Sequence, residues 1–272
     1  MLVFPKAKIN LGLRITGKRS DGYHNIETIF YPVSLCDALE MVINAKSPDR
    51  DILTLTGYDL PGIVEENIVI RAINKLRESY SIPFLMIHLH KNIPAGAGLG
   101  GGSSDAACML RTLDRMLRLS LSIDELKSVA SGLGSDCPFF IDCQPAFASG
   151  RGEILEPVRS VISGFYVVLL NPGISISTKE AYDNCVPAPP GSSLAELISK
   201  PVTEWKELIF NDFEKTIFKR YPQIKMIKQA LYASGAVYSS MSGSGSTVYG
   251  IFDEKPAIPG KLKKLVIYNG EL

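Results

Sequence analysis

The stretch Pro94–Ala107 limits what this chain can fold into more than any other part of the sequence. It follows an apolar run, Phe84–Leu89, and five of the seven residues in Gly96–Gly102 are glycine. Apolar residues then recur at steps of four, three and four, the period of an amphipathic helix, at Ala106, Leu110, Leu113 and Leu117. The pattern therefore predicts a strand, a glycine loop and the N-terminus of a helix.

Such a loop predicts a binding site for an anion, most often a phosphate. Glycine lets the backbone approach a ligand closely, and the first N–H groups of the helix point at that ligand. A flexible linker remains an alternative, although linkers are seldom placed between a buried strand and a capped helix. The residues assigned to the site are Pro94, Ala95, Gly96, Ala97, Gly98, Leu99, Gly100, Gly101, Gly102, Ser103 and Ser104.

Three familiar phosphate-binding motifs do not fit this loop. A Walker A loop ends in Gly-Lys-Ser/Thr, whereas Gly102 is followed by two serines and an aspartate. A dinucleotide fold needs an acidic residue at the end of a second strand about twenty residues on, but Ser122–Glu125 is a helix-starting capping box. The companion motifs of protein kinases are missing from the sequence. What remains is a glycine and serine loop that carries its own hydroxyl groups to the phosphates.

The composition predicts a soluble, cytoplasmic protein. Hydrophobic residues make up 46% and charged residues 21% of the 272 residues, and the net charge is +1, so no bulk attraction to nucleic acid or membrane follows. The five cysteines are scattered without a C-x-x-C pair, which fits a reducing compartment. No apolar run approaches the twenty residues needed to cross a bilayer.

Two segments near the N-terminus carry candidate polar residues. Alternation over residues 6–15 predicts a half-buried strand, one face of which holds Lys6, Lys8 and Asn10. A solvated strand face explains these lysines equally well. The turn closed by Asp21–Gly22 then presents Tyr23–His24, an exposed aromatic pair suited to binding.

Asp136 is the most unusual carboxylate in the sequence. It precedes Cys137–Phe140, a bulky apolar segment with a proline suited to a first helical turn. A charge in such surroundings is costly unless something pairs with it. An ordinary helix N-cap is the structural alternative.

The order of predicted elements divides the chain in two. Strands at Glu40–Ile43 and Ile52–Thr56 predict a hairpin, and a continuous apolar strand at Phe165–Leu170 opens a second domain. The predicted domains are residues 1–160 and 161–272. A second small-residue loop, Ser242–Thr247, precedes a strand predicted at Val248–Phe252.

Five separated motifs together resemble the GHMP small-molecule kinase superfamily. Three of them, Ala7–Leu11, Pro94–Ala107 and Ser242–Val248, are similar to the motifs shared across that superfamily. Asp21–His24 and Asp136–Phe140 are similar to the branch that phosphorylates a cytidine diphosphate sugar alcohol on the non-mevalonate route to isoprenoids. One departure is that Pro5 stands one residue earlier than in the family pattern, which makes Lys6 a rival of Lys8.

The resemblance implies an α+β fold of two domains. The N-terminal domain would resemble domain 2 of ribosomal protein S5 and bind ATP, and the C-terminal domain would be a ferredoxin-like α/β sandwich that binds substrate. The implied reaction transfers a phosphoryl group from ATP to a tertiary hydroxyl, with Mg2+ on the phosphates. Asp136 would accept the hydroxyl proton, and Lys8 would orient Asp136 and stabilise the charge on the reacting oxygens, roles that phosphoryl transfer requires.

The resemblance also implies a substrate pocket and small-molecule partners. It implies that the Ser242–Thr247 loop closes over the phosphates or the sugar diphosphate of the substrate. A cytosine ring would stack between two aromatic rings, and the chain would act as a monomer or homodimer without nucleic acid. Two alternatives stay open: a kinase of the homoserine or mevalonate type, and a non-catalytic ATP or ligand sensor. The residues assigned to the substrate are Asn10, Tyr23, His24, Phe30, Thr178 and Tyr182.

Overall fold

The computed structural model describes residues 1–45, 49–60, 62–183, 185–189 and 191–272. The chain forms two compact units that interleave along the sequence. The first unit combines residues 1–7, 35–95 and 100–144, and the second combines residues 8–34, 96–99 and 145–272. Because these units do not follow one break in the chain, the domain boundary at residue 160 stays a prediction.

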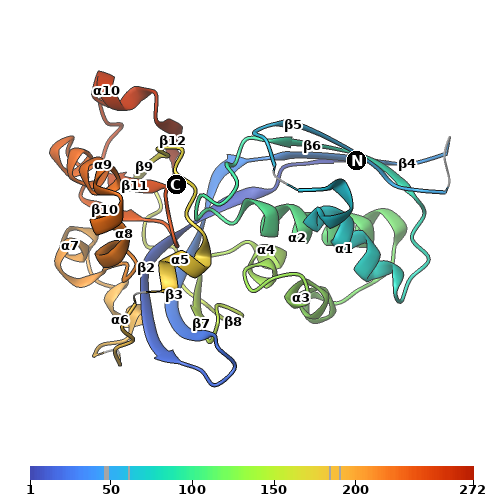
Figure 1. Cartoon of the computed structure of the whole chain (residues 1–272), viewed down its shortest axis with the longest axis horizontal. Helices are drawn as coiled ribbons and strands as arrows, with labels where there is room; N and C mark the ends of the chain where they lie inside the picture. Colours follow the sequence, from blue (N-terminus) through green and yellow to red (C-terminus); the bar gives the residue numbers. More distant parts are fainter. Residues whose placement is uncertain (46–48, 61, 184, 190) are drawn as a thin grey trace. The chain divides into compact units, whose positions relative to one another are not determined.

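The first unit contains a four-stranded sheet in the order β1-β4-β6-β5 (Figure 1). The central strand β6 pairs antiparallel with β4 and parallel with β5. The predicted hairpin is therefore wrong, because β6 lies between its two strands. A parallel pair needs a crossover connection, which the helix α1 supplies here. The strands are β1 (Leu2–Val3), β4 (Ala38–Ile43), β5 (Ile52–Gly57) and β6 (Leu85–Lys91).

Helices complete the first unit, and their starts follow the local sequence. Asn67 caps α1 by accepting a hydrogen bond from the Val69 N–H at 3.0 Å. Ser122 and Glu125 form the predicted capping box of α3. The helices are η1 (Val64–Glu66), α1 (Ile68–Arg77), α2 (Gly101–Leu117), α3 (Ile123–Ser131) and α4 (Cys137–Asp142). Their contacts run from α1 to α2, from α2 to α4 and from α3 to α4.

The second unit contains a sheet in the order β2-β3-β7-β8 and a second sheet in the order β10-β11-β9-β12. If the strands of this second sheet are numbered 1 to 4 in chain order, from β9 to β12, their order in the sheet is 2-3-1-4. Each strand is antiparallel to its neighbours. This topology is that of the predicted ferredoxin-like sandwich. The strands are β2 (Lys6–Lys18), β3 (His24–Cys36), β7 (Ala146–Ser149), β8 (Ile154–Pro157), β9 (Tyr166–Leu170), β10 (Tyr238–Met241), β11 (Val248–Phe252) and β12 (Val266–Glu271).

The core of the second unit joins residues that are far apart in sequence. Leu13, Ile15 and Ile26 pack in one buried cluster with Val168 and Leu231 from the C-terminal half. Helix α9 covers β10 and β11 (Figure 1). The helices are α5 (Thr178–Tyr182), α6 (Leu194–Leu197), η2 (Val202–Glu204), α7 (Trp205–Leu208), α8 (Glu214–Arg220), α9 (Pro222–Ala233) and α10 (Gly260–Lys263).

Candidate functional site

The predicted phosphate loop lies, as expected, between a strand and a helix, and its second half starts α2. Gly100 is the N-cap residue with φ of +71°, and no side chain caps the helix. The first intrahelical hydrogen bond runs from the Ser104 N–H to the Gly100 carbonyl at 2.9 Å. An uncapped start of a 17-residue helix directs N–H groups and the positive end of the dipole at an anion.

The first half of the loop, Gly96–Leu99, belongs to the second unit and packs on the Ser242–Thr247 loop. The Ser242 hydroxyl donates to the Gly98 carbonyl at 2.8 Å, and the Thr247 N–H donates to the Ala97 carbonyl at 3.3 Å. These two hydrogen bonds hold the Ser242–Thr247 loop against the first half of the glycine loop. The predicted role of the Ser242–Thr247 loop over the phosphates or the sugar diphosphate stays a prediction.

Substitution of Gly98 by alanine should unfold or inactivate the protein. Its φ is +76°, and an added Cβ would lie 2.0 Å from the Ser242 carbonyl oxygen, which is backbone and cannot rotate away. We expect a loss of at least about 2 kcal/mol in the free energy of unfolding, from overpacking and the unfavourable φ together. Denaturant unfolding and activity would be measured in parallel.

Gly164 supplies the matched control for that substitution. Its φ is +85°, but an added Cβ meets nothing within 4 Å. Gly164→Ala should therefore show only the cost of the left-handed backbone, about 1 kcal/mol. Equal losses in the two variants would contradict the assigned contact between the two loops.

Lys8 is buried in the second unit, with 4% of its surface exposed. Its Nζ donates to the Asn10 Oδ1 at 2.5 Å and lies 4.8 Å from the centre of the Phe30 ring. Its backbone N–H donates to the Leu99 carbonyl at 2.9 Å, which ties β2 to the glycine loop. The solvated strand face is thus wrong for Lys8 and Asn10, whereas Lys6 is exposed.

Asn10 is held by a network that sequence reasoning did not find. Its Nδ2 donates to the Thr28 Oγ1 at 2.9 Å, and its backbone N–H donates to the Ser242 hydroxyl at 3.2 Å. The Tyr249 hydroxyl donates to the Asn10 carbonyl at 2.8 Å. Every partner of Asn10 is buried, so its amide oxygen stays directed at Lys8. A contact from Asn10 to substrate remains a prediction.

Asp136 is half-buried at the N-cap position of α4 in the first unit. Its backbone is helical, with φ of −84°, and its side chain makes no capping hydrogen bond, so the alternative as an ordinary N-cap is wrong. Burial raises the pKa of the neighbouring Cys137 thiol to about 11, and a hydrogen bond with the Ser103 side chain acts in the opposite direction. Asp136 is therefore the sequence neighbour of Cys137, which contacts Ser103 in the first turn of α2.

The predicted substrate residues only partly come together. His24 stacks on Tyr182 at 4.7 Å between ring centres and 11° between planes, and Phe213 meets Tyr182 edge-on at 4.9 Å. Tyr23 is 55% exposed, and Arg151 lies 5.1 Å from its ring centre. His24 thus occupies a face of Tyr182 that the predicted cytosine stack could use. Thr178 is exposed at the first position of α5.

Sequence reasoning missed Phe213 and Arg151 beside these aromatic residues. The backbone N–H of Tyr23 donates to the Asp21 Oδ1 at 3.1 Å, and this hydrogen bond lowers the pKa of Asp21. The Arg151 side chain comes from the turn between β7 and β8, so no spacing in the sequence connects it with Tyr23.

Neither a metal cluster nor a membrane helix is found in the described part of the chain. No group of three or more His, Cys, Asp or Glu residues among these residues could hold a metal ion. None of the described helices has both the length and the apolar character needed to cross a membrane.

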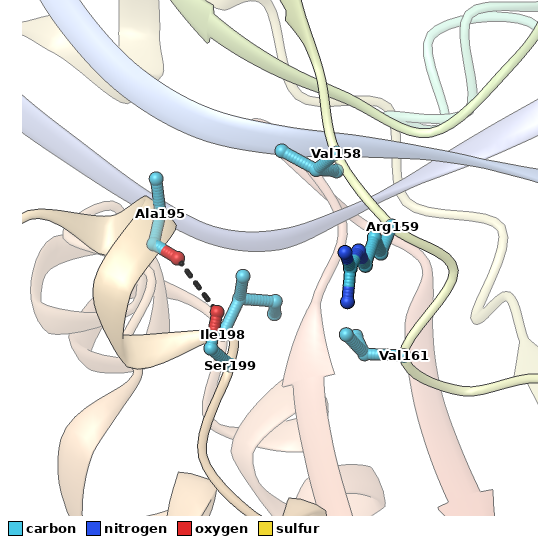
Figure 2. A pocket seen from close by; sticks show the side chains of 6 residues that line it. All are labelled: Val158, Arg159, Val161, Ala195, Ile198 and Ser199. Atoms are coloured by element: carbon cyan, nitrogen blue, oxygen red, sulfur yellow. Dashed lines mark hydrogen bonds between the residues drawn. The ribbon is translucent and has the colours of Figure 1, made fainter.

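A separate surface pocket of 420 Å³ lies in the second unit (Figure 2). The Ser199 hydroxyl donates to the Ala195 carbonyl at 3.3 Å on one wall. Among the described residues that line the pocket, Arg159 alone is charged, and most of the others are apolar. The lining residues are Val158, Arg159, Val161, Ala195, Ile198 and Ser199, and none is among the predicted site residues.

Comparison with known proteins defines the class. The GHMP kinases N terminal domain matches residues 67–144, and the GHMP kinases C terminal domain matches residues 193–264. Together with the relatives described next, these matches show that the chain belongs to the GHMP kinase family. The predicted fold class and the predicted resemblance are thereby confirmed.

The relatives narrow the class to one kind of kinase. A 4-diphosphocytidyl-2-C-methyl-D-erythritol kinase from Parabacteroides distasonis is 52% identical over 256 residues, which cover 94% of this chain and 93% of the relative. One of the same name from Azobacteroides pseudotrichonymphae is 50% identical over 270 residues, or 99% of each chain. The crystal structure of a 4-(cytidine 5'-diphospho)-2C-methyl-D-erythritol kinase has a TM-score of 0.75 at 31% identity, covering 94% of this chain and 91% of that one. The prediction of a small-molecule kinase is confirmed.

Proposed function

We propose that this chain transfers a phosphoryl group from ATP to the 2-hydroxyl of 4-diphosphocytidyl-2-C-methyl-D-erythritol, on the non-mevalonate route to isoprenoids. The relatives above support the reaction, since two of them exceed 49% identity over nearly their full length. One structural observation carries the proposal. Helix α2 starts at a glycine without a side-chain cap, and Asp136 precedes Cys137, whose thiol forms a hydrogen bond with Ser103 in the first turn of α2. We also propose a cytoplasmic location and a monomer or homodimer.

The donor phosphates are assigned to the start of α2. Gly102 is exposed there, and the first turn carries the Ser103 and Ser104 hydroxyl groups. Bound Mg2+ would neutralise charge on the phosphates, and it commonly uses few protein carboxylates when phosphates supply ligands. Ser103 is our candidate for the hydroxyl that would contact the ion.

The acceptor chemistry is assigned to Asp136 and Lys8. A tertiary alcohol is a weak nucleophile, so a carboxylate that accepts its proton assists attack on the γ-phosphorus. The proton passes to Asp136 as the new O–P bond forms and the bond to the ADP oxygen breaks. Lys8 would stabilise the charge on the reacting oxygens, and Asn10 and Phe30 hold its ammonium group in position.

The cytidine ring is assigned to the aromatic group around Tyr182. Since stacking of a base on an aromatic ring contributes roughly 1 to 3 kcal/mol, Tyr182→Leu should raise the KM for the diphosphocytidyl alcohol about tenfold. The KM for ATP should change less than about twofold, because the ring is assigned to the other substrate. Tyr182→Phe keeps the ring and should behave like the native enzyme. A Leu variant with native KM values would remove Tyr182 from the pocket.

Substrate selection provides the decisive experiment for the function. ATP consumption would be measured with the diphosphocytidyl alcohol, with mevalonate and with homoserine, and the product would be located by phosphorus NMR. We expect turnover with the first substrate alone and phosphate on its 2-hydroxyl. Turnover with mevalonate or homoserine instead would establish a related kinase, and ATP binding without any turnover would establish a sensor.

A further inference from the structure

Three buried ionisable side chains meet in the first unit, close to the two ends of the predicted phosphate loop. Lys91 ends β6, Asp37 follows β3, and Asp105 lies in the second turn of α2. Their exposed fractions are 2%, 0% and 1%. The Lys91 Nζ donates to the Asp37 Oδ2 and to the Asp105 Oδ2, the latter at 2.7 Å. A buried cation of this kind costs free energy unless its geometry is well satisfied.

The cluster holds both ends of the phosphate loop. The Asp37 Oδ1 accepts the backbone N–H groups of Asn92 and Ile93, at 2.6 Å and 2.8 Å, just where the chain leaves β6 for the loop. The Asp105 carboxylate holds α2, where the loop ends. An added Cβ on Gly101 would lie 3.3 Å from the Lys91 Nζ, so the first residue of α2 packs directly over the ammonium group.

We propose that Lys91 is a positioning residue for the donor-phosphate site, because through Asp37 and Asp105 it fixes the exit of β6 against the start of α2. This inference rests on the proposed function only in placing ATP at that helix start. Because Lys91 is only 2% exposed, it would act through backbone placement rather than by contact with the nucleotide.

The charge of the cluster depends on Asp105. Burial raises the pKa of Asp105 to about 8; Lys91 opposes that shift and Asp37 adds to it. Cys108, one turn along α2, stays neutral because burial raises its pKa to about 11. Among the described residues, the Asp105 Oδ1 has no hydrogen-bond partner. Asp105 therefore gains a negative charge near the anion site as the pH rises through about 8.

Equilibrium binding of ATP with Mg2+ to the full-length protein tests the proposal. Lys91→Met should weaken binding about tenfold or more, because displacement of a binding group by a fraction of an ångström is costly. The native protein should lose about threefold in affinity between pH 7 and pH 9 as the negative charge appears. Asp105→Asn, neutral at every pH, should lose that pH dependence.

The stability of Asp105→Asn gives a second readout with a definite sign. The pKa of Asp105 is raised in the folded chain, so the unfolded chain releases this proton first as the pH rises. The native free energy of unfolding should decline relative to that of the variant from about pH 4 to about pH 8. This readout keeps the charge assignment testable if Lys91→Met fails to fold.

Asp51→Asn is the matched control in the same unit. Asp51 pairs with Arg77 and accepts the Leu85 N–H at 2.8 Å, so its loss should lower the melting temperature without changing ATP affinity. Native ATP affinity in Lys91→Met, or an unchanged pH dependence in Asp105→Asn, would overturn the proposal. Because ATP binding is measured without the alcohol, failure of the proposed substrate would leave this result standing.

Discussion

Asp136→Asn should lower kcat by about three orders of magnitude, within the range for loss of a general base. The asparagine has nearly the same shape but cannot accept the proton of the attacking hydroxyl. Binding of both substrates should persist, with KM values within a few-fold of native, since the lost interaction is made mainly in the transition state. Steady-state kinetics at saturating ATP would measure both parameters.

Asp142→Asn is the control for that substitution. Asp142 ends the same short helix, is exposed, and forms a surface ion pair with Lys127 at 2.5 Å. Its loss should change neither kcat nor KM, because exposed ion pairs contribute little to structure. A kcat for Asp136→Asn within tenfold of native would remove Asp136 from the role of base.

Lys8→Met should lower kcat by two to three orders of magnitude, the usual loss when one charge-stabilising group is removed from a transition state. Methionine fills much of the space of the buried lysine stem beside Phe30, so the fold should survive. KM values should rise far less than kcat falls. Rapid-quench measurement of the phosphoryl-transfer step would separate chemistry from product release.

Lys6→Met decides between the two lysines of β2. Lys6 is exposed, whereas Lys8 is buried and fixed by the Asn10 amide at 2.5 Å. We therefore expect Lys6→Met to keep native kcat. The opposite result, a large loss in Lys6→Met and none in Lys8→Met, would reverse the assignment.

Features set by neighbouring residues could be predicted from the sequence. The capping box of Ser122 and Glu125 was located correctly, because caps depend on contacts within four residues. The start of α2 was placed at the glycine run for the same reason. The five family motifs then indicated the fold class, which the matches to both GHMP kinase domains confirm.

Features set by distant residues could not be predicted. Strands β4 and β5 are close in sequence, but both pair with β6, and alternation of residues does not encode the partner of a strand. Lys91 and Asp37 are 54 residues apart, and Asp105 lies on a third element, so their cluster leaves no local pattern. The stack of His24 on Tyr182 is likewise a tertiary contact. The burial of Lys8 also results from contacts with residues that are distant in sequence, so alternation along its strand did not predict it.

The interleaving of the two units bears on how this protein can be dissected. Leu13, Ile15 and Ile26 complete the core beneath the C-terminal sheet, although more than a hundred residues separate them from it. A fragment that began at residue 161 would leave that core open to water and prone to aggregate. Circular permutants or two co-expressed fragments that restore the 8–34 segment are thus better tools than simple truncation for studying this half of the molecule.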